Sequence, residues 1–539
     1  MVTRQDVTGV PPRPSVEPPR ASPVRARRAR RPGGLLAVSS LIAAGLALPL
    51  VFLLIEASQA GLSTVISLIF RPLTATLLWN TVRLTVVVTV LCAIIGTGAA
   101  WLIERTNLPG RRIWAVLVVV PLAIPDFVVS FGWESLWGWV HGFRGAVLVM
   151  TLAVYPLVYL PVAASLRAAD PAQEEVARSL GTSRLRTFAR ITLGQARGAI
   201  LGGCLLVALV LLAEYGAFEI LGYQTFTTEI FTEFNSAFST TAACALSLVL
   251  VVLSLLVLGG EGMLRGRGRA VRVGAMAQRV APPHRLGATA IPALASLTLL
   301  VLLALGLPVA ASIYWIFEGG VPSVTSATSV SMLDAAWHTA VYGAAAGALD
   351  TLLALPVALL AIRYSGRARH FLERSTYLVL AMPGVVIALA LTFFTERYLA
   401  GTGYQTAPLL VICYAIMFFP LALVGVKAAV ARAPASLDEM SRSLGQRKLA
   451  TLRRVTLRLA GPGLAAAFCL VFLSVITELT ATLLLVPTGV QTLATQFWQY
   501  ETNSSYGQAA PFALVMIAVA AVPSYVLGRF FDRSAHEQG

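Results

Sequence analysis

Long apolar segments alternate with short polar connections along most of the chain. Runs of about 20 apolar residues match a hydrocarbon core of ~30 Å, because an α-helix rises ~1.5 Å per residue. The pattern therefore predicts an all-α membrane protein with about twelve transmembrane helices. The predicted spans cover residues 35–55, 78–103, 113–133, 146–166, 197–221, 240–260, 289–316, 336–361, 375–395, 407–426, 462–486 and 509–529.

One polar segment between these spans occurs twice. Residues 175–193 and 439–457 are identical at ten of nineteen positions and lie 264 residues apart. Identical residues also recur in register on both sides of this segment, which indicates that the whole membrane unit is duplicated. We therefore predict two homologous six-helix halves. The recurring pairs include Trp79 with Trp337, Arg105 with Arg363, Pro125 with Pro383, Glu214 with Glu478, and Thr228 with Thr492.

Composition sets the boundaries of the halves. Residues 1–34 are rich in Pro and Arg and have too few apolar side chains to fold, so we expect a disordered, basic cytosolic tail. The first half covers residues 35–260 and the second covers 289–530. A basic cytosolic linker with six arginines, residues 261–288, separates them, and residues 531–539 form a second cytosolic tail.

The distribution of Lys and Arg predicts the orientation, since positive charge is retained on the cytosolic side. With a cytosolic N-terminus, the outer connections hold only Arg71, Arg144 and Arg397, and 37 of the 41 basic residues lie on the cytosolic side. Topology and attraction to anionic lipid account for the net charge of +16, so we expect no nucleic-acid binding. The outer connections instead carry Glu134, Glu219, Glu229, Glu233, Glu318, Asp334 and Glu501.

The reactive side chains do not form an enzyme-like pattern. The five cysteines and five histidines are scattered without metal-ligand spacing, so we expect no catalytic residues, no bound metal and no cofactor in this chain. A phosphate-binding P-loop needs a GxxxxGK[ST] motif, and neither Lys427 nor Lys448 belongs to one. If ATP drives this protein, partner subunits must hydrolyse it.

The duplicated segment resembles the EAA loop of ABC importer permeases. In both copies a glycine follows the glutamate by six positions: Glu175 with Gly181, and Glu439 with Gly445. The family pattern has Ala after the Glu, where this chain has Val176 and Met440. Its closing Leu-Pro is replaced by Leu193-Gly194 and Leu457-Arg458. The resemblance implies ATPase-coupling loops whose candidate residues are Glu175, Arg178, Gly181, Glu439, Arg442 and Gly445.

This resemblance also implies an architecture and a set of partners. The fold would be that of a type I ABC importer permease, in the bacterial inner membrane with both termini in the cytosol. Two copies of a cytosolic ATPase would dock on the two loops, and an extracytoplasmic solute-binding protein would deliver the solute to the acidic outer face. Membrane lipid would surround the helices.

Two later segments bear on the solute. Residues 213–231 and 477–500 resemble the corresponding regions of fused ferric-iron permeases, although Thr480 stands where that family has Pro. Fused thiamine permeases share the two-half layout, and phosphonate or other small-solute permeases are related. The resemblance therefore favours ferric iron and leaves thiamine or another small solute as alternatives.

Two carboxylates fall inside predicted spans at matching repeat positions, Glu214 and Glu478. A buried carboxylate in a membrane helix costs roughly 2.5–3.5 kcal/mol on insertion scales, so each should face a cavity or a polar partner. Two interpretations stay open: a role in the translocation path or gate, together with Tyr215 and Thr480, or a hydrogen bond that joins the two halves.

A protein of another class could also have twelve spans in two halves. An ion-coupled secondary transporter of the major facilitator type carries its signature between spans two and three, where Glu104–Arg112 shares little beyond its closing Gly-Arg-Arg. A membrane enzyme would need a cluster of His, Cys or carboxylate residues, which the sequence lacks. Co-purification of an ATPase would separate the importer from the secondary transporter.

Overall fold

A computed structural model describes residues 33–169, 172–265, 283–319, 326–364, 366–399 and 403–536. Within these ranges every regular element is a helix, apart from one isolated bridge between Thr106 and His284. The predicted tail lies almost wholly outside the described residues, as does the middle of the predicted linker, so those two predictions stay untested.

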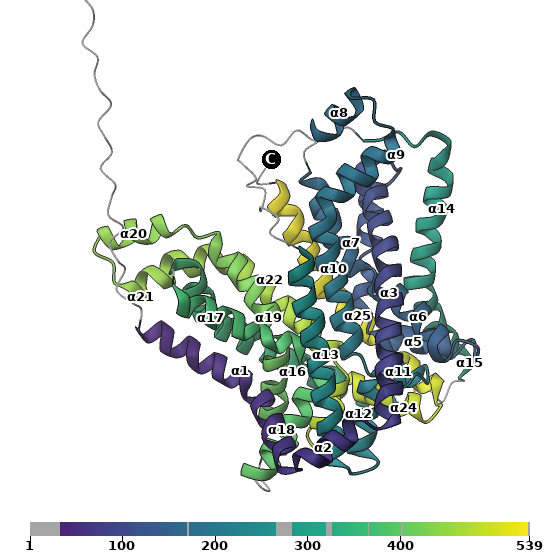
Figure 1. The fold of residues 1–539 in the computed structure, drawn as a ribbon, viewed down its shortest axis with the longest axis vertical. Coiled ribbons are helices and arrows are strands. Elements are labelled where there is room, and N and C mark those ends of the chain that lie inside the picture. The colour runs from purple at the N-terminus through teal and green to yellow at the C-terminus, as the bar shows by residue number, and fades with distance from the viewer. Residues whose placement is uncertain are drawn as a thin grey trace, which may run out of the picture.

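The helices follow the repeat (Figure 1). The first half contains α1 (Gly33–Gln59), α2 (Leu62–Ile69), α3 (Pro72–Arg105), α4 (Arg111–Leu117), α5 (Asp126–Glu134), α6 (Gly142–Val154), α7 (Pro156–Arg167), α8 (Ala172–Ser179), α9 (Arg184–Thr187), α10 (Leu193–Ala213), α11 (Gly216–Ile220), α12 (Phe226–Asn235) and α13 (Thr240–Arg265). The second half contains α14 (Ala290–Val301), α15 (Leu307–Glu318), α16 (Ser326–Arg363), α17 (Arg367–Thr376), α18 (Gly384–Tyr398), α19 (Ala407–Ala431), α20 (Ala435–Ser443), α21 (Lys448–Thr451), α22 (Leu457–Ile476), α23 (Thr480–Leu485), α24 (Leu493–Thr502) and α25 (Tyr506–His536).

Each predicted span coincides with a helical segment, but two of them are not straight. Nine segments of the described chain are long and apolar enough to cross a membrane. The spans predicted at 113–133 and 375–395 are instead helix pairs bent by 91° and 100°. The bends fall at Pro125 and Pro383, because proline cannot donate the backbone hydrogen bond that a continuous helix needs. The last predicted span corresponds to the start of α25, apolar over Tyr506–Ala521.

Two further spans end earlier than the sequence predicts. The spans placed at 197–221 and 462–486 were expected to continue through Glu214 and Glu478. In the structure α10 ends at Ala213 and α22 ends at Ile476, and each is followed by a short separate helix. The two glutamates therefore lie at helix breaks, where backbone groups need partners, and not within uninterrupted helices.

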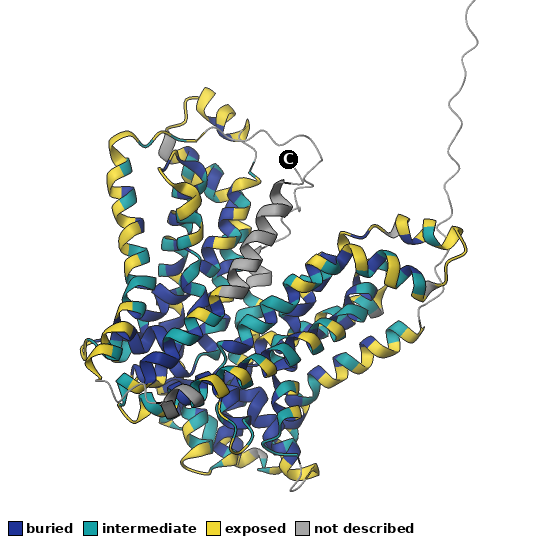
Figure 2. Ribbon diagram, turned by 180° about the vertical axis from the view of Figure 1, so that it is seen from behind, coloured by how far each residue is buried: buried dark blue, intermediate teal, exposed yellow. Residues whose placement is uncertain are grey.

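The two halves of the sequence exchange their outer helices in space. One buried cluster joins α3, α5, α6 and α7 to residues of α14, α24 and α25, while another joins α1 and α13 to α16, α18 and α19. In Figure 1, α14 and α15 accordingly lie on the side of the first-half helices, where α15 packs against α5, and α1 runs beside α17. The resulting two limbs diverge toward the ends that carry α8 and α20, and buried residues concentrate where the limbs meet (Figure 2).

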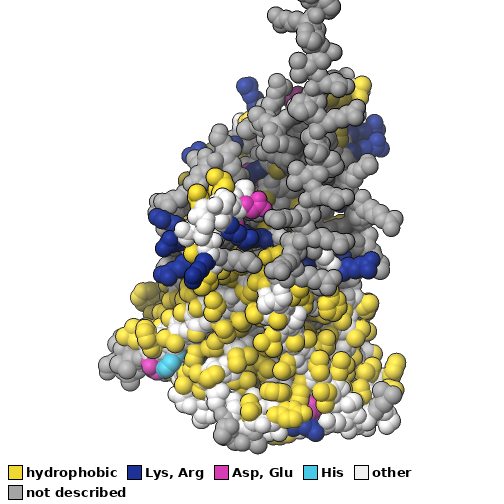
Figure 3. Space-filling view, turned by 90° about the vertical axis from the view of Figure 1, so that its left-hand side faces the viewer, with side chains coloured by type: hydrophobic (Ala, Val, Ile, Leu, Met, Phe, Trp, Pro, Cys, Tyr) yellow, Lys and Arg dark blue, Asp and Glu magenta, His cyan; other side chains and the backbone are white. Residues whose placement is uncertain are grey.

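The surface is divided between an apolar belt and a basic end. Figure 3 shows hydrophobic side chains around the helices, with Lys and Arg gathered toward the end of α8 and α20. At the opposite end, Arg71 lies 2.6 Å from Glu233, and Arg397 lies 3.3 Å from Glu56. These two predicted outer arginines are therefore paired with carboxylates.

Candidate coupling surfaces and translocation path

The repeated segment forms a short helix at the far end of each limb, α8 in the first and α20 in the second (Figure 1). We call α8 and α20 the coupling helices. Glu175, Arg178, Glu439 and Arg442 are all exposed on them. Each helix also leaves two apolar side chains uncovered at matching repeat positions, Val176 and Leu180 in one copy and Met440 and Leu444 in the other. Charged and apolar groups exposed together suit docking to a partner.

A glycine ends both coupling helices in the same way. Gly181 and Gly445 have φ angles of 80° and 82°, a left-handed conformation that favours glycine. The Gly181 N–H donates to the Arg178 carbonyl at 3.0 Å, and the Thr182 N–H donates to the Ala177 carbonyl at 3.1 Å. The second copy has the equivalent bonds. This is the Schellman motif, in which a left-handed residue lets the backbone satisfy the last carbonyls of a helix.

A buried ion pair ties α8 to the membrane helices. The Arg105 Nη2 atom, on the last residue of α3, lies 2.5 Å from Glu174 Oε1 in the first turn of α8. The Thr192 hydroxyl donates to the same Glu174 oxygen at 2.8 Å. Arg105 and Glu174 are about 5% exposed, so water is largely excluded from this contact.

The second half repeats this arrangement with an aspartate. Arg363, on the last residue of α16, pairs with Asp438 in the first turn of α20. The Thr456 hydroxyl donates to Asp438 Oδ1 at 3.0 Å, and Arg363 Nη2 also donates to the Ala433 carbonyl at 3.4 Å. We call these two sets the joints: Arg105–Glu174–Thr192 in the first half and Arg363–Asp438–Thr456 in the second.

Each joint threonine lies in a widened helical turn. Thr192 ends a π-helical turn over Phe188–Thr192, and Thr456 ends one over Leu452–Thr456. Such turns are rare and occur often at functional sites. The turns lead directly into α10 and α22, so each joint connects three elements: the coupling helix and the two membrane helices beside it.

The sequence contained a signal for the joints. The motif glutamates beside it were singled out instead. Arg105 with Arg363 and Thr192 with Thr456 are identical repeat pairs, while Glu174 and Asp438 immediately precede the motif glutamates. Of two adjacent acidic residues in each copy, the first is buried against Arg and the second is exposed. Sequence reasoning singled out the exposed one.

Glu214 and Glu478 cap the short helices that follow the breaks. Glu214 Oε1 accepts the Ala217 N–H at 2.8 Å, and Glu478 Oε1 accepts the Ala481 N–H at 2.8 Å. A carboxylate at this position satisfies an otherwise unpaired backbone donor and interacts favourably with the helix dipole. These hydrogen bonds lie within each half and do not join the halves, which was one of the two interpretations that the sequence left open.

The two breaks nevertheless meet near the contact between the halves. Leu479 Cδ2 lies 2.7 Å from where a side chain on Gly216 would begin, and Phe127 Cβ lies 3.1 Å from the same point. The charges of Glu214 and Glu478 are close enough to interact, as are those of Asp126 and Glu214. Asp126 has no carboxylate counterpart, because Gly384 occupies its repeat position.

The other two candidate residues are buried beside these breaks. Tyr215 is 3% exposed and packs against Phe231 and Trp498, with ring centroids 4.4 Å and 5.6 Å away. Thr480 is 6% exposed and begins α23. Both therefore support the geometry of the breaks.

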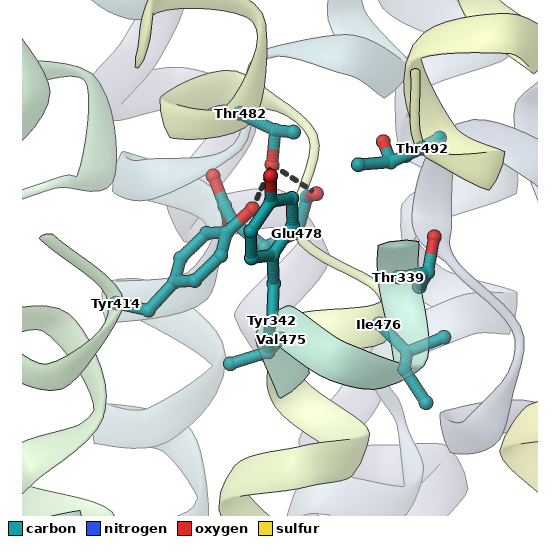
Figure 4. A pocket seen from close by; sticks show the side chains of 9 residues that line it. Thr339, Tyr342, Tyr414, Val475, Ile476, Glu478, Thr482 and Thr492 are labelled. Carbon is teal, nitrogen blue, oxygen red and sulfur yellow. Dashed lines mark hydrogen bonds between the residues drawn. The ribbon is translucent and has the colours of Figure 1, made fainter. Parts of the chain in front are cut away.

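A small cavity lies beside Glu478 (Figure 4). The Tyr414 and Thr482 hydroxyls are 2.6 Å apart, and Thr482 donates to the Glu478 backbone carbonyl at 2.8 Å. Thr339 and Thr492, which form part of its wall, come from α16 and from the turn before α24. The cavity thus combines a carboxylate with hydroxyls, which suits a polar occupant.

Three carboxylates interact on the outer side of the breaks. Burial, together with the neighbouring Glu134 and Glu219, raises the pKa of Glu501 from 4.5 to about 7. His141 Nε2 lies 3.7 Å from Glu134. Among the described residues, no three His, Cys, Asp or Glu side chains are placed to hold a metal ion together.

The fold and the two coupling helices define a class: a polytopic, all-helical membrane transport subunit of duplicated architecture. A family model described as the binding-protein-dependent transport system inner membrane component matches this chain twice, over residues 92–267 and 350–536. The chain therefore belongs to this family, the permeases of ABC importers, and has their type I fold. It is a multi-pass inner-membrane protein that works with an ATPase and a solute-binding protein.

Individual relatives extend the likeness over the whole chain. The Fe(3+)-transport system permease protein FbpB 2 of Haemophilus influenzae is 36% identical over 506 residues, covering 93% of this chain and 99% of that protein. The ferric transport system permease protein FbpB of Actinobacillus pleuropneumoniae is 24% identical over 78% of this chain and 66% of its own. The sulfate transport system permease protein CysW of Escherichia coli is 26% identical over 40% of this chain and 84% of its own.

Proposed function

We propose that this permease carries ferric iron across the inner membrane. The observation that carries the proposal is the near full-length similarity to a relative named for Fe(3+) transport, at an identity well above that of the sulfate relatives. Thiamine or another small solute is the alternative within the same class.

Two copies of the ATPase dock on the coupling helices. Both helices lie at the divergent ends of the limbs, and both present an exposed glutamate, an exposed arginine and two exposed apolar side chains in the same register (Figures 1 and 2). Equivalent surfaces on two limbs suit two identical partners. The basic end of the molecule would face the cytosol (Figure 3), because positive charge is retained on that side.

The solute-binding protein docks at the opposite end. The acidic cluster of Glu134, Glu219 and Glu501 lies there, beside the breaks that hold Glu214 and Glu478. A negative surface raises the local concentration of a cation as it is released. From there the solute would pass between the limbs toward the diverging cytosolic ends.

Uptake of labelled ferric iron tests the solute, with labelled thiamine measured in parallel. Cells that lack this chain are compared with cells in which it is restored. We expect the restored chain to restore iron uptake. Vanadate should inhibit this uptake, and an uncoupler should not. Restored thiamine uptake without iron uptake would move the solute assignment while leaving the importer class intact, and uptake abolished by the uncoupler alone would favour the secondary transporter.

Co-purification tests the docking surfaces. Leu180→Asp together with Leu444→Asp places a charge in each exposed apolar patch, so the yield of bound ATPase should fall at least tenfold. Phe238→Ser is the matched control, since Phe238 is 83% exposed at the other end of the molecule. Substituting both Glu175 and Glu439 by Ala should lower ATPase-coupled uptake while membrane insertion stays normal. Unchanged ATPase binding and uptake in all these variants would exclude docking at α8 and α20.

A further inference from the structure

We propose that the two joints are positioning devices that transmit movement of the coupling helices to the membrane helices. The inference rests on the proposed docking of ATPases at α8 and α20. It assigns a role to six residues outside the recognised motif positions: Arg105, Glu174, Thr192, Arg363, Asp438 and Thr456.

Separating the acidic side chain of a joint from its arginine and threonine would cost free energy. Glu174 is 4% exposed and Asp438 is 6% exposed, and each is bound by both an arginine and a threonine hydroxyl. Moving the coupling helix away from the arginine would leave two buried charges without partners, which is strongly unfavourable. A coupling helix held in this way moves together with its membrane helices and does not slide over them.

The positions of the three groups allow each joint to carry movement from the coupling helix to a membrane helix. The arginine is the last residue of α3 or α16, the acid lies in the first turn of the coupling helix, and the threonine ends the turn that begins α10 or α22. α10 has 21 residues and α22 has 20. Each is therefore about 30 Å long. α10 ends one residue before Glu214, and α22 ends two residues before Glu478. A displacement at the joint is thereby carried to Glu214 or Glu478.

The two copies reach the same contact by different means. The first joint uses the longer Glu174 and has the end of the linker beside it, since the His284 N–H donates to the Arg105 carbonyl at 2.8 Å. The second uses the shorter Asp438, and Arg363 Nη2 reaches Thr456 Oγ1 at 3.5 Å as well. The joint persists although the acid, its surroundings and the spacing differ. Such persistence favours a functional requirement over an incidental contact.

Coupling efficiency in the full complex provides the test. Permease, ATPase and binding protein are reconstituted in liposomes, and solute uptake is divided by ATP hydrolysed. Arg105→Gln, Arg363→Gln and Thr192→Val should each lower this ratio at least fivefold while the ATPase still co-purifies. Thr192→Ser keeps the hydroxyl and should restore the ratio to within twofold of the parent. Arg71→Gln, which breaks an ion pair of similar length at the outer end, should leave the ratio unchanged.

The outcomes separate the two proposals. An unchanged ratio in the arginine and Thr192→Val variants overturns the joint as a positioning device. A lower ratio in Thr192→Val that Thr192→Ser fails to restore also overturns it, because the hydroxyl would then not be the group that matters. If the arginine variants fail to accumulate in the membrane, the Thr192 pair still decides. Failure of docking itself would appear differently, as ATPase binding that does not depend on α8 and α20.

Discussion

The two halves are most alike at the ends that carry the coupling helices and differ more at the helix breaks around Glu214 and Glu478. At the coupling helices, both copies have the Schellman glycine, the exposed Glu and Arg, and the buried joint. At the breaks, Asp126 in the first half corresponds in the repeat to Gly384 in the second, and Tyr215 corresponds to Leu479. The repeat is therefore maintained where both halves would meet identical partners.

The divergence is greatest where one solute would pass a single shared path. Two identical ATPases, as proposed above, would impose the same requirement on both halves, whereas a single solute between the limbs would not. The break glutamates are the exception, since Glu214 and Glu478 cap their helices with equal geometry. This exception indicates that the caps maintain the fold of the path and not the selection of the solute.

The largest effect should come from removing these caps. Glu214→Ala and Glu478→Ala each leave a backbone N–H unpaired at a buried helix start, which costs about 1–2 kcal/mol. The thermal midpoint of the purified protein should fall, and uptake should fall with it. Gln retains the accepting oxygen, so Glu214→Gln and Glu478→Gln should preserve stability. If the Gln variants keep their stability but lose uptake, the charge itself has a role in the path.

Replacing either Schellman glycine by Ala should have a smaller effect, and this effect should be the same in both halves. Ala at Gly181 or Gly445 meets no atom within 4 Å, so the cost is that of the left-handed backbone, about 1 kcal/mol. Coupled ATP hydrolysis should fall by a similar factor in either variant. Asn tolerates this conformation and should restore most of the activity. Gly198→Ala is the control, since Gly198 has open space and an ordinary helical conformation, and unequal losses at the two glycines would show that the ATPases contact the limbs differently.

The coupling helices and the breaks at Glu214 and Glu478 also differ in how far the sequence predicted them. The duplicated motif predicted α8 and α20 and the exposed Glu175 and Glu439, because a repeated polar segment between apolar runs is local information. The exchange of α1 and α14 between limbs could not be predicted, since apolar periodicity does not specify which helix packs against which. The breaks at Glu214 and Glu478 were missed because the residues around them remain apolar, and the cap depends on geometry.

Substituting Asp126 tests more directly how the two halves differ at the breaks, since Gly384 occupies its repeat position. The half-buried carboxylate of Asp126 lies near that of Glu214, and two carboxylates close together in a poorly solvated site repel each other. Asp126→Asn should therefore raise the thermal midpoint by about 2 °C. Asp334→Asn, at an exposed carboxylate, should change it by less than about 1 °C. A lower midpoint in Asp126→Asn would mean that the carboxylate has a stabilising partner, and that the difference from Gly384 is structural.

The last effect depends on pH and concerns Glu501, whose repeat position in the first half is Ala237. Its pKa is raised from 4.5 to about 7, so between these values the folded state binds more protons than the unfolded state, and its contribution to stability falls as pH rises. The groups that interact here are Glu134 and Glu219, with His141 beside Glu134. Glu501→Gln should thus raise the thermal midpoint at pH 8, leave it nearly unchanged at pH 4.5, and flatten its dependence on pH in between. A variant with the same pH dependence as the parent would show that water solvates the Glu501 carboxylate, and that this difference between the halves has no effect on stability.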